Sequence, residues 1–298
     1  MMCSQPFMRN PRGKIRWSTK MTPEERLECT PFPCGCCLPC RINKARTWQH
    51  RIMLEAKSHA HSLFVTLTYS KDFLPPDGGL RKSHLQSFLK RLRRSLDGIK
   101  IRYFAVGEYG ERGNRPHYHV CVFGLSESYT GNIVKSWSKN SVSIGHVHLG
   151  QITPHSARYI AGYTIKKLTK TGDERLEGRP PEFMLSSRKE GGIGLPEVLR
   201  IAESLKKNEY WDDDTVINSF KIGGRVFPLG GYLTGKLLDA LGVSSETRDA
   251  KLWEYQQKMF NQNLIHTEDY YFNLIDSTFV QRQKIEKRSK IFKKEKIL

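Results

Sequence analysis

The sequence predicts an α+β fold through residue 168, with elements in the order β, α, β, β, β, α. Residues 62–69 (SLFVTLTY) are dense in β-branched and aromatic side chains, which is typical of a buried strand. Residues 82–96 place leucine and phenylalanine at helical spacing and turn their arginines outward, as in a helix that packs on a sheet. Residues 101–109 and 117–125 are two strand-like runs joined by the turn-forming GERGNRP, which predicts an antiparallel hairpin.

The remaining elements follow from similar patterns. Residues 1–28 are polar, basic and proline-containing, without a helical or strand period, so we expect a flexible basic arm. An amphipathic helix begins at Arg41, and its basic face is either solvated or in contact with a phosphate backbone. Residues 143–152 predict a fourth strand and residues 156–168 a helix. Residues 171–298 are expected to form a mainly helical and loop-rich accessory region that ends in a basic tail.

The overall charge indicates the class of partner. The 298 residues carry a formal net charge of +19, which favours a polyanion, and above all nucleic acid. A basic protein without such a partner is the alternative. No apolar run approaches the roughly 20 residues of a membrane span, and the N-terminal sequence lacks a secretory signal. We therefore expect no membrane contact and a cytoplasmic location.

Two histidines flank Tyr118 in the strand-like run HYHVCVFGL. Side chains two positions apart in a strand point to the same face, so His117 and His119 are expected to stand side by side while Tyr118 points away. This spacing suits two ligands of one metal ion. Two histidines that only pack on or in the sheet are the alternative.

A carboxylate is predicted to join this pair. If the hairpin turn is centred between Arg112 and Gly113, antiparallel pairing places Glu108 opposite His117. Two imidazoles and one carboxylate leave coordination positions open and suit Mg²⁺ or Mn²⁺ that also grips a substrate oxygen. Glu111 is an alternative third ligand, ranked lower because it lies inside the turn.

Two tyrosines lie one helical turn apart in the predicted helix. Tyr159 and Tyr163 share a face with Lys167, and Lys166 lies beside it. Such a face suits a nucleophile for phosphodiesters, in which a phenoxide attacks phosphorus and a second phenol permits a second transfer. A phenol with a pKa of about 10 lies about 4 kcal/mol from its phenoxide at neutral pH, so a metal ion and a lysine would have to assist. An aromatic stripe that docks the helix into the core is the alternative.

Cysteines are concentrated near the start of the helix at Arg41. The chain has seven, an odd number unlike a secreted disulfide framework, and Cys34, Cys37 and Cys40 repeat at CxxC spacing. Zinc prefers four ligands, and Cys29 is the candidate for the fourth position of a structural zinc site. Free thiols in a loop before a DNA-contacting helix are the alternative.

The ordered segments FVTLTY, GEYG, RPHYHVCVFG and YIAGYTIKK resemble the rolling-circle replication initiators of small single-stranded DNA phages, in particular the gokushovirus branch of the microviruses. These proteins are HUH endonucleases. The resemblance covers at least residues 29–170, including the cysteine-rich segment, and extends through SSRKEGGIG. It identifies residues 29–170 as the nuclease domain.

The resemblance implies a role for each motif. Both histidines would be metal ligands, Glu108 would match the acidic ligand of single-tyrosine relatives, and both tyrosines would be nucleophiles. Residues 66–68 would form the family's first conserved strand near the active site. The resemblance also implies a central antiparallel sheet of about five strands, flanked by helices, with the histidine strand in the middle. Tyr118 departs from the pattern, which has a bulky apolar residue there, but its ring can pack on the far side of the sheet.

These observations predict a metal-dependent DNA endonuclease and strand transferase. It would nick single-stranded DNA at a phage replication origin, form a 5′-phosphotyrosine link and later religate the strand in the host bacterial cytoplasm, with host helicase and polymerase as candidate partners. The alternative is a non-catalytic single-stranded nucleic-acid-binding protein with an RRM-like sheet. A phosphodiesterase with two histidine motifs would need a second HxT or HxS, and His146 and His148 supply only HVH.

Overall fold

The computed structural model describes residues 29–110, 113–166, 172–210, 217–222 and 225–244, together with short stretches of the first 28 residues and single positions after residue 244. The chain forms two compact units. The larger consists of residues 44–213 and 217–242, and the smaller of residues 1–43, 214–216 and 243–298.

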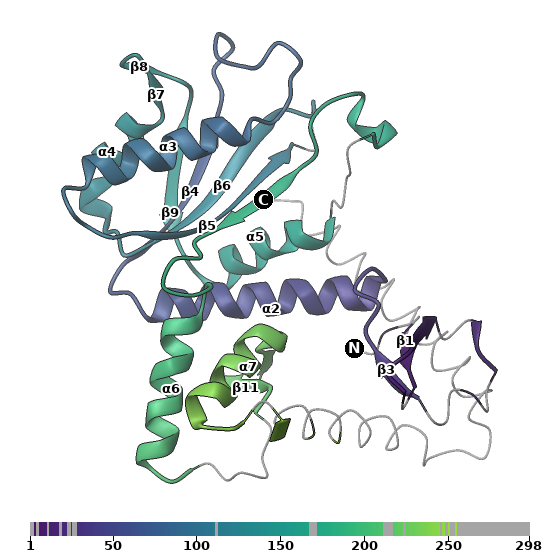
Figure 1. Ribbon diagram of the computed structural model, residues 1–298. Helices are drawn as coiled ribbons and strands as arrows, with labels where there is room; N and C mark the ends of the chain where they lie inside the picture. Colours follow the sequence, from purple (N-terminus) through teal and green to yellow (C-terminus); the bar gives the residue numbers. More distant parts are fainter. Residues whose placement is uncertain are drawn as a thin grey trace. The chain divides into compact units, whose positions relative to one another are not determined.

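The larger unit is built on a five-stranded sheet with the strand order β10-β5-β6-β4-β9, in which every neighbouring pair is antiparallel (Figure 1). The histidine strand, β6, is in the middle. The predicted α+β fold with a central antiparallel sheet is therefore confirmed. The strands are β4 (Ser62–Thr68), β5 (Arg102–Tyr109), β6 (Pro116–Phe123), β9 (Val147–Gln151) and β10 (Phe183–Ser186).

The register of the sheet brings polar residues from different strands to one face. Glu108 of β5 lies opposite His117 of β6, as the centre of the predicted turn requires. On the other side of β6, Thr66 of β4 pairs with His119 and Thr68 pairs with His117. Because side chains alternate along a strand, all five residues share one face of the sheet.

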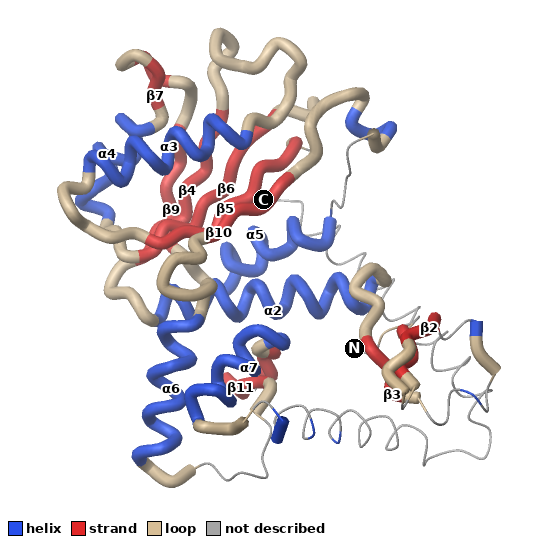
Figure 2. Tube along the Cα trace, in the orientation of Figure 1, coloured by secondary structure: helices blue, strands red, loops and turns tan. Residues whose placement is uncertain are grey.

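Helices cover both faces of this sheet (Figure 2). On one face, α3 buries Leu85, Phe88, Leu89 and Leu92, the side that its helical spacing predicts. On the opposite face, apolar side chains of α2 and α5 pack against β5 and β6. The helices are α3 (Lys82–Ser95) with α4 (Thr130–Ser136) on the first face, and α2 (Leu38–Lys57) with α5 (Pro154–Lys166) on the second.

Two of these elements differ from their expected positions. The helix expected from Arg41 begins at Leu38, because Pro39 fits the first turn of a helix, where a backbone N–H has no partner within the helix. The edge strand β10 lies beyond residue 170, so the central sheet takes one strand from the segment expected to be an accessory region.

The rest of the larger unit adds a helix pair and short elements. Helices α6 and α7 pack on each other, and α7 buries four leucines. The basic tail expected at the C-terminus lies outside the described residues. The further elements are η2 (Glu127–Tyr129), β7 (Ser138–Lys139), β8 (Val142–Ser143), η3 (Glu174–Leu176), α6 (Leu195–Lys207), β11 (Ser219–Ile222), β12 (Arg225–Pro228) and α7 (Gly230–Leu241).

The smaller unit contains a sheet with the order β2-β1-β3. Its strands are β1 (Phe7–Arg9), β2 (Ile15–Trp17) and β3 (Thr30–Phe32). Two of them lie within residues 1–28, where the sequence predicts no strand. Three-residue strands are too short to show an alternating pattern, which is why the expectation of an arm without strands is wrong. Within the part of the chain that the structure describes, no helix is long and apolar enough to span a bilayer.

Candidate active site

The candidate site lies on the sheet face that α2 and α5 cover. Nε2 of His117 is 2.5 Å from Oε1 of Glu108, and Nε2 of His119 is 2.9 Å from the same oxygen. One ligand atom from each of these three residues lies within 4.8 Å of the others. Glu108 and His119 are buried, whereas His117 is partly exposed. The hairpin register therefore brings together the three ligands that the sequence predicts.

The second nitrogen of each imidazole fixes the orientation of its ring. Nδ1 of His117 donates to the backbone carbonyl of Arg115 at 3.2 Å. Nδ1 of His119 is hydrogen-bonded to Oγ1 of Thr66 at 2.9 Å. Both Nε2 atoms are thereby directed at the Glu108 carboxylate, and only a proton or a cation can lie between such lone pairs without repulsion. The donor set fits a divalent ion.

Burial and hydrogen bonding set the charges of these groups. Burial alone would raise the pKa of Glu108, but hydrogen bonds from both imidazoles outweigh it and hold the pKa below its usual value. Burial lowers the pKa of His119, and this effect exceeds the opposing attraction of the Glu108 carboxylate. Near neutral pH the site therefore holds an ionised carboxylate and a neutral His119, which are the forms that bind metal ions.

Helix α5 presents both tyrosines to His119. The Tyr159 hydroxyl lies 3.5 Å from Nε2 of His119. The Tyr159 ring meets the imidazole edge to face at 5.2 Å between centroids, and the Tyr163 ring stacks on it at 5.7 Å and 16°. Tyr159 is 42% exposed, while Tyr163 is half-buried and packs against the apolar cluster beneath α5. Both phenols thus surround the imidazole that contacts the carboxylate.

Several candidate residues fall outside this constellation. Lys166 ends α5, but its side chain, all of Lys167 and the alternative ligand Glu111 lie outside the described residues, so their roles stay predictions. His146 and His148 are exposed, at and beside the edge strand β9.

Two contacts give roles that the sequence does not reveal. Thr66 is expected near the site, but its hydrogen bond to His119 depends on the pairing of β4 with β6, which leaves no local signal. Tyr118 is fully buried on the opposite face of the sheet, where its hydroxyl lies 2.6 Å from the hydroxyl of Tyr69. The expectation that its ring packs on the far side is confirmed.

The cysteine cluster of the smaller unit differs from the expected one. Cys34, Cys37 and Cys40 come together with Cys3, not with Cys29. The Cys29 thiol instead donates to the backbone carbonyl of Glu25 at 3.1 Å. The expected fourth member of the cluster is therefore corrected. Spacing could not find Cys3, because it lies 31 positions before Cys34.

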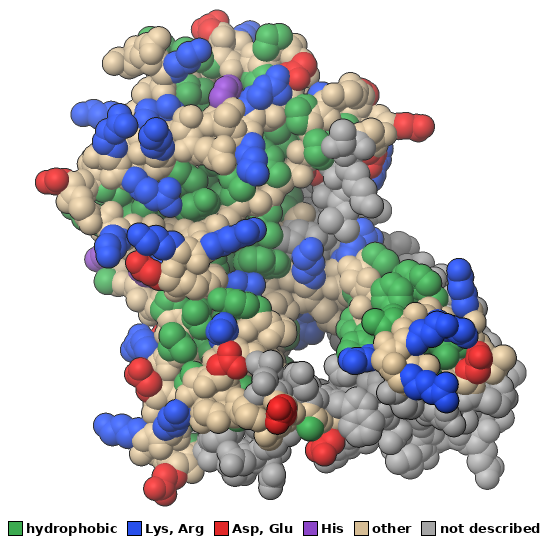
Figure 3. Space-filling model, in the orientation of Figure 1, with side chains coloured by type: hydrophobic (Ala, Val, Ile, Leu, Met, Phe, Trp, Pro, Cys, Tyr) green, Lys and Arg blue, Asp and Glu red, His purple; other side chains and the backbone are tan. Residues whose placement is uncertain are grey.

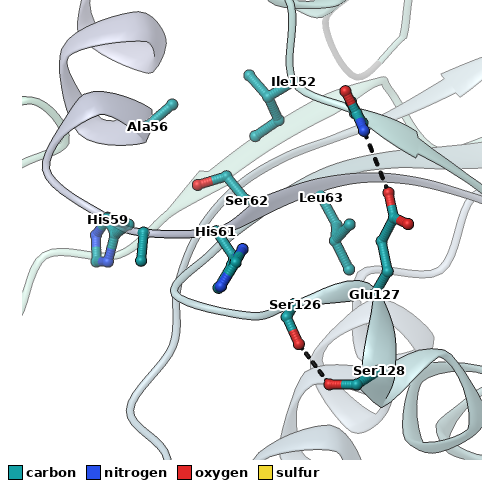
Figure 4. A pocket seen from close by; sticks show the side chains of 11 residues that line it. Ala56, His59, His61, Ser62, Leu63, Ser126, Glu127, Ser128 and Ile152 are labelled. Carbon is teal, nitrogen blue, oxygen red and sulfur yellow. Dashed lines mark hydrogen bonds between the residues drawn. The ribbon is translucent and has the colours of Figure 1, made fainter.

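A cavity of about 550 Å³ opens in the larger unit between the end of α2, the first residues of β4, η2 and the end of β9 (Figure 4). His61 and Ser62 border it, and Glu127 accepts a hydrogen bond there from the side chain of Gln151 at 3.4 Å. None of the Glu108, histidine and tyrosine side chains lines it. It is a separate feature from the candidate active site, since Leu63 in its wall lies roughly 10 Å along β4 from Thr66.

Comparison with known proteins matches this chain to phage replication proteins. The family model for the replication-associated protein ORF2 matches residues 62–171, which run from β4 through α5. Replication-associated protein ORF2 of Spiroplasma virus 4 is 32% identical over 223 residues, covering 69% of this chain and 67% of that protein. Replication-associated protein VP4 of Bdellovibrio phage phiMH2K is 31% identical, covering 60% and 62%.

A third relative, replication-associated protein ORF4 of Chlamydia phage 1, is 32% identical over 46% of this chain and 38% of its own length. The chain thus spans less than two thirds of the Bdellovibrio and Chlamydia phage proteins. No solved structure matches. The stretch matched by the family model contains Glu108, both histidines and both tyrosines. The chain therefore belongs to the ORF2 family of replication-associated proteins, which confirms its resemblance to the replication initiators of microviruses.

Proposed function

We propose that this protein is an HUH-type rolling-circle replication initiator that nicks single-stranded DNA at a phage origin through a tyrosine. The observation that carries the proposal is the Tyr159 hydroxyl, 3.5 Å from an imidazole nitrogen that itself meets the Glu108 carboxylate. Membership of a phage replication-associated family supports the same conclusion. The protein acts in the host bacterial cytoplasm, and host helicase and polymerase are its further partners.

The metal-binding residues are Glu108, His117 and His119, which converge on one point and fit Mg²⁺ or Mn²⁺. An ion bound there supplies Lewis-acid polarisation of the scissile phosphate. Thr66 and the Arg115 carbonyl hold the two imidazoles in the orientation that this binding requires.

The reaction is an exchange of one phosphodiester for another. The Tyr159 oxygen forms a bond to phosphorus, the bond from phosphorus to the 3′ oxygen breaks, and a proton passes from the phenol to the released 3′ hydroxyl. The 5′ end stays on the protein as a phosphotyrosine ester. A 3′ hydroxyl attacking that ester reverses the exchange and religates the strand, while Tyr163 makes a second cleavage available. Lys166 and Lys167 assist by favouring the phenoxide or stabilising the leaving oxygen.

The fold argues against the non-catalytic alternative. An RRM-like binder stacks bases on aromatic side chains of an open sheet face. Here α3 and α4 cover one face and α2 and α5 the other, with an apolar cluster beneath each pair (Figure 2). The polar residues on the second face also converge on one point, whereas a stacking surface would spread its aromatic rings along the strands.

A covalent-capture experiment tests the proposal. Single-stranded oligonucleotides tiled across the genome that encodes the protein are incubated with the full chain and Mn²⁺, then resolved on a denaturing gel. One oligonucleotide should yield a protein adduct at its 5′ fragment, and chelation of Mn²⁺ should prevent the adduct. The double variant Tyr159→Phe/Tyr163→Phe should form no adduct yet bind the same oligonucleotide.

Single variants separate the two phenols. Tyr159→Phe should lose the first cleavage, because its hydroxyl is the one beside Nε2 of His119, whereas Tyr163→Phe should retain it. Tyr210→Phe is the matched control, since Tyr210 is 81% exposed and contributes nothing to the site. A double variant that still forms the adduct, or an adduct that maps to another residue by mass spectrometry, would refute the assignment.

A further inference from the structure

Four thiols meet in the smaller unit, apart from the candidate active site. The Sγ atoms of Cys3, Cys34, Cys37 and Cys40 all lie within 4.8 Å of one another. Two of the separations are 3.7 Å, between Cys3 and Cys37, and 4.0 Å, between Cys34 and Cys40. All four are reduced thiols. Three of the residues come from the turn before α2 and its first turn, and the fourth comes from the N-terminus.

These separations match one kind of ligand set. Four sulfur atoms at the corners of a tetrahedron, each about 2.3 Å from a central zinc ion, lie about 3.8 Å from one another. A disulfide would instead bring two sulfur atoms to about 2.05 Å and leave the other pair unused. Backbone N–H groups also point at the cluster: that of Cys34 donates to the Cys3 sulfur and that of Cys37 to the Cys34 sulfur, both at 3.3 Å. Such bonds stabilise the thiolate forms that bind zinc.

We propose that Cys3, Cys34, Cys37 and Cys40 hold a structural zinc ion, with Cys3 as the fourth ligand. Cys29 is excluded as that ligand because its buried thiol donates to the Glu25 carbonyl and lies outside the group of four. Cys36 lies beside the group and is exposed, so it serves as a neighbouring thiol without a place in the tetrahedron.

The small sheet beside the cluster gives the ion a physical purpose. Strands β1, β2 and β3 have three residues each, and Met8 is the buried side chain among the described residues of β1 and β2. A sheet of this size cannot exclude enough apolar surface from water to be stable alone. An ion shared by Cys3 and the residues before α2 closes the chain around β1, β2 and β3, and the free energy of zinc binding becomes free energy of folding.

Zinc content of the full-length chain tests the site. After loading with zinc and desalting, mass spectrometry of the metals should find one zinc ion per chain that a moderate chelator does not remove. Cys3→Ser should lose this ion under the same conditions. Cys29→Ser and Cys36→Ser are the matched controls and should retain it. A double variant His117→Ala/His119→Ala should also retain it, which separates this ion from any metal at the candidate active site.

Alkylation of the unmodified chain gives a second measurement that does not depend on how a variant folds. Iodoacetamide labelling, mapped by mass spectrometry with and without chelator, should show Cys3, Cys34, Cys37 and Cys40 protected by zinc and Cys36 labelled in both states. The proposal is overturned if the loaded chain holds no zinc, if Cys3→Ser retains it, or if zinc protects Cys29 in place of Cys3.

Discussion

His119 is the residue at which the candidate active site is assembled. Its Nε2 meets Glu108 and the Tyr159 hydroxyl, and its Nδ1 meets Thr66. Its ring lies between aromatic rings, with Phe64 stacked at 5.5 Å as well as the two tyrosines. Each of these contacts restricts the imidazole, so the direction of its nitrogen lone pair is set before any ligand arrives.

The contact with Thr66 can be tested alone. Thr66→Val keeps the shape of the side chain but removes the hydroxyl, so the imidazole loses the partner that orients it. We expect the affinity for Mn²⁺ to fall about 10- to 100-fold, as for other residues that orient metal ligands. Calorimetric titration of the full chain measures this. Thr68→Val is the matched control, because Thr68 lies on the same strand and face but bonds to the His146 carbonyl. Equal affinities in the two variants would contradict the role of Thr66.

The residues of the site differ in how far the sequence reveals them. The histidine pair and Glu108 can be predicted, because strand alternation and one short turn fix their relation. The tyrosine pair is likewise local to one helix. Thr66 and Cys3 depend instead on partners 53 and 31 positions away, where no spacing rule applies.

At the scale of elements, α2, β5 and the start of α6 are joined through Glu55. This carboxylate is fully buried, is paired with Arg102 of β5, and accepts the Gly194 N–H at 2.6 Å immediately before α6. Burial alone would raise its pKa, but hydrogen bonds from His59, Gly194 and Arg102 outweigh burial and lower the pKa. A depressed folded-state pKa means that the ionised carboxylate stabilises the fold.

Replacement of this carboxylate should therefore destabilise the larger unit in a pH-dependent way. Glu55→Gln leaves Arg102 without its charge partner, and we expect the free energy of unfolding at pH 7 to fall by about 3 kcal/mol. The stabilisation by Glu55 is complete above the unfolded-state pKa of about 4.3 and is lost as the pH falls through the lower folded-state value. The difference between wild type and variant in urea unfolding should thus shrink below about pH 4. A difference independent of pH would refute this account.

Elements with a strong local pattern can be predicted, and edge strands cannot. Strand β4 and helix α3 follow their apolar spacing closely. Strand β10 has four residues and no alternation, and its place in the sheet depends on Gly107 of β5, where a Cβ atom would lie 2.8 Å from the ring of Phe183. Only the tertiary contact explains why a glycine stands inside β5.

At the scale of the whole molecule, the positive charge is unevenly available to a partner. Figure 3 shows lysine and arginine side chains spread over the face that carries α3 and α4. On α2, by contrast, the Arg46 guanidinium donates to the Val226 carbonyl at 2.8 Å and that of Arg51 donates to the Ile193 carbonyl at 2.9 Å. These two arginines are occupied within the larger unit, which weakens the interpretation of the basic face of α2 as a phosphate contact.

The net charge of +19 still makes DNA binding sensitive to salt. If about five phosphates are contacted, raising salt from about 50 to about 200 mM should lower the affinity for single-stranded DNA about 10²-fold. Fluorescence anisotropy with the Tyr159→Phe/Tyr163→Phe variant measures this without covalent capture. An affinity that does not change with salt would show that phosphate contacts contribute little.

The central position of β6 has a consequence for engineering. Both neighbours of this strand are hydrogen-bonded to it, so the proposed chemistry sits where the backbone has least freedom, while β9 and β10 each have one unpaired edge within the described sheet. Loops grafted beside those outer strands could change which nucleotide sequence is recognised without disturbing the proposed nuclease centre. The architecture therefore separates target choice from bond cleavage, and new specificities can be sought at the periphery alone.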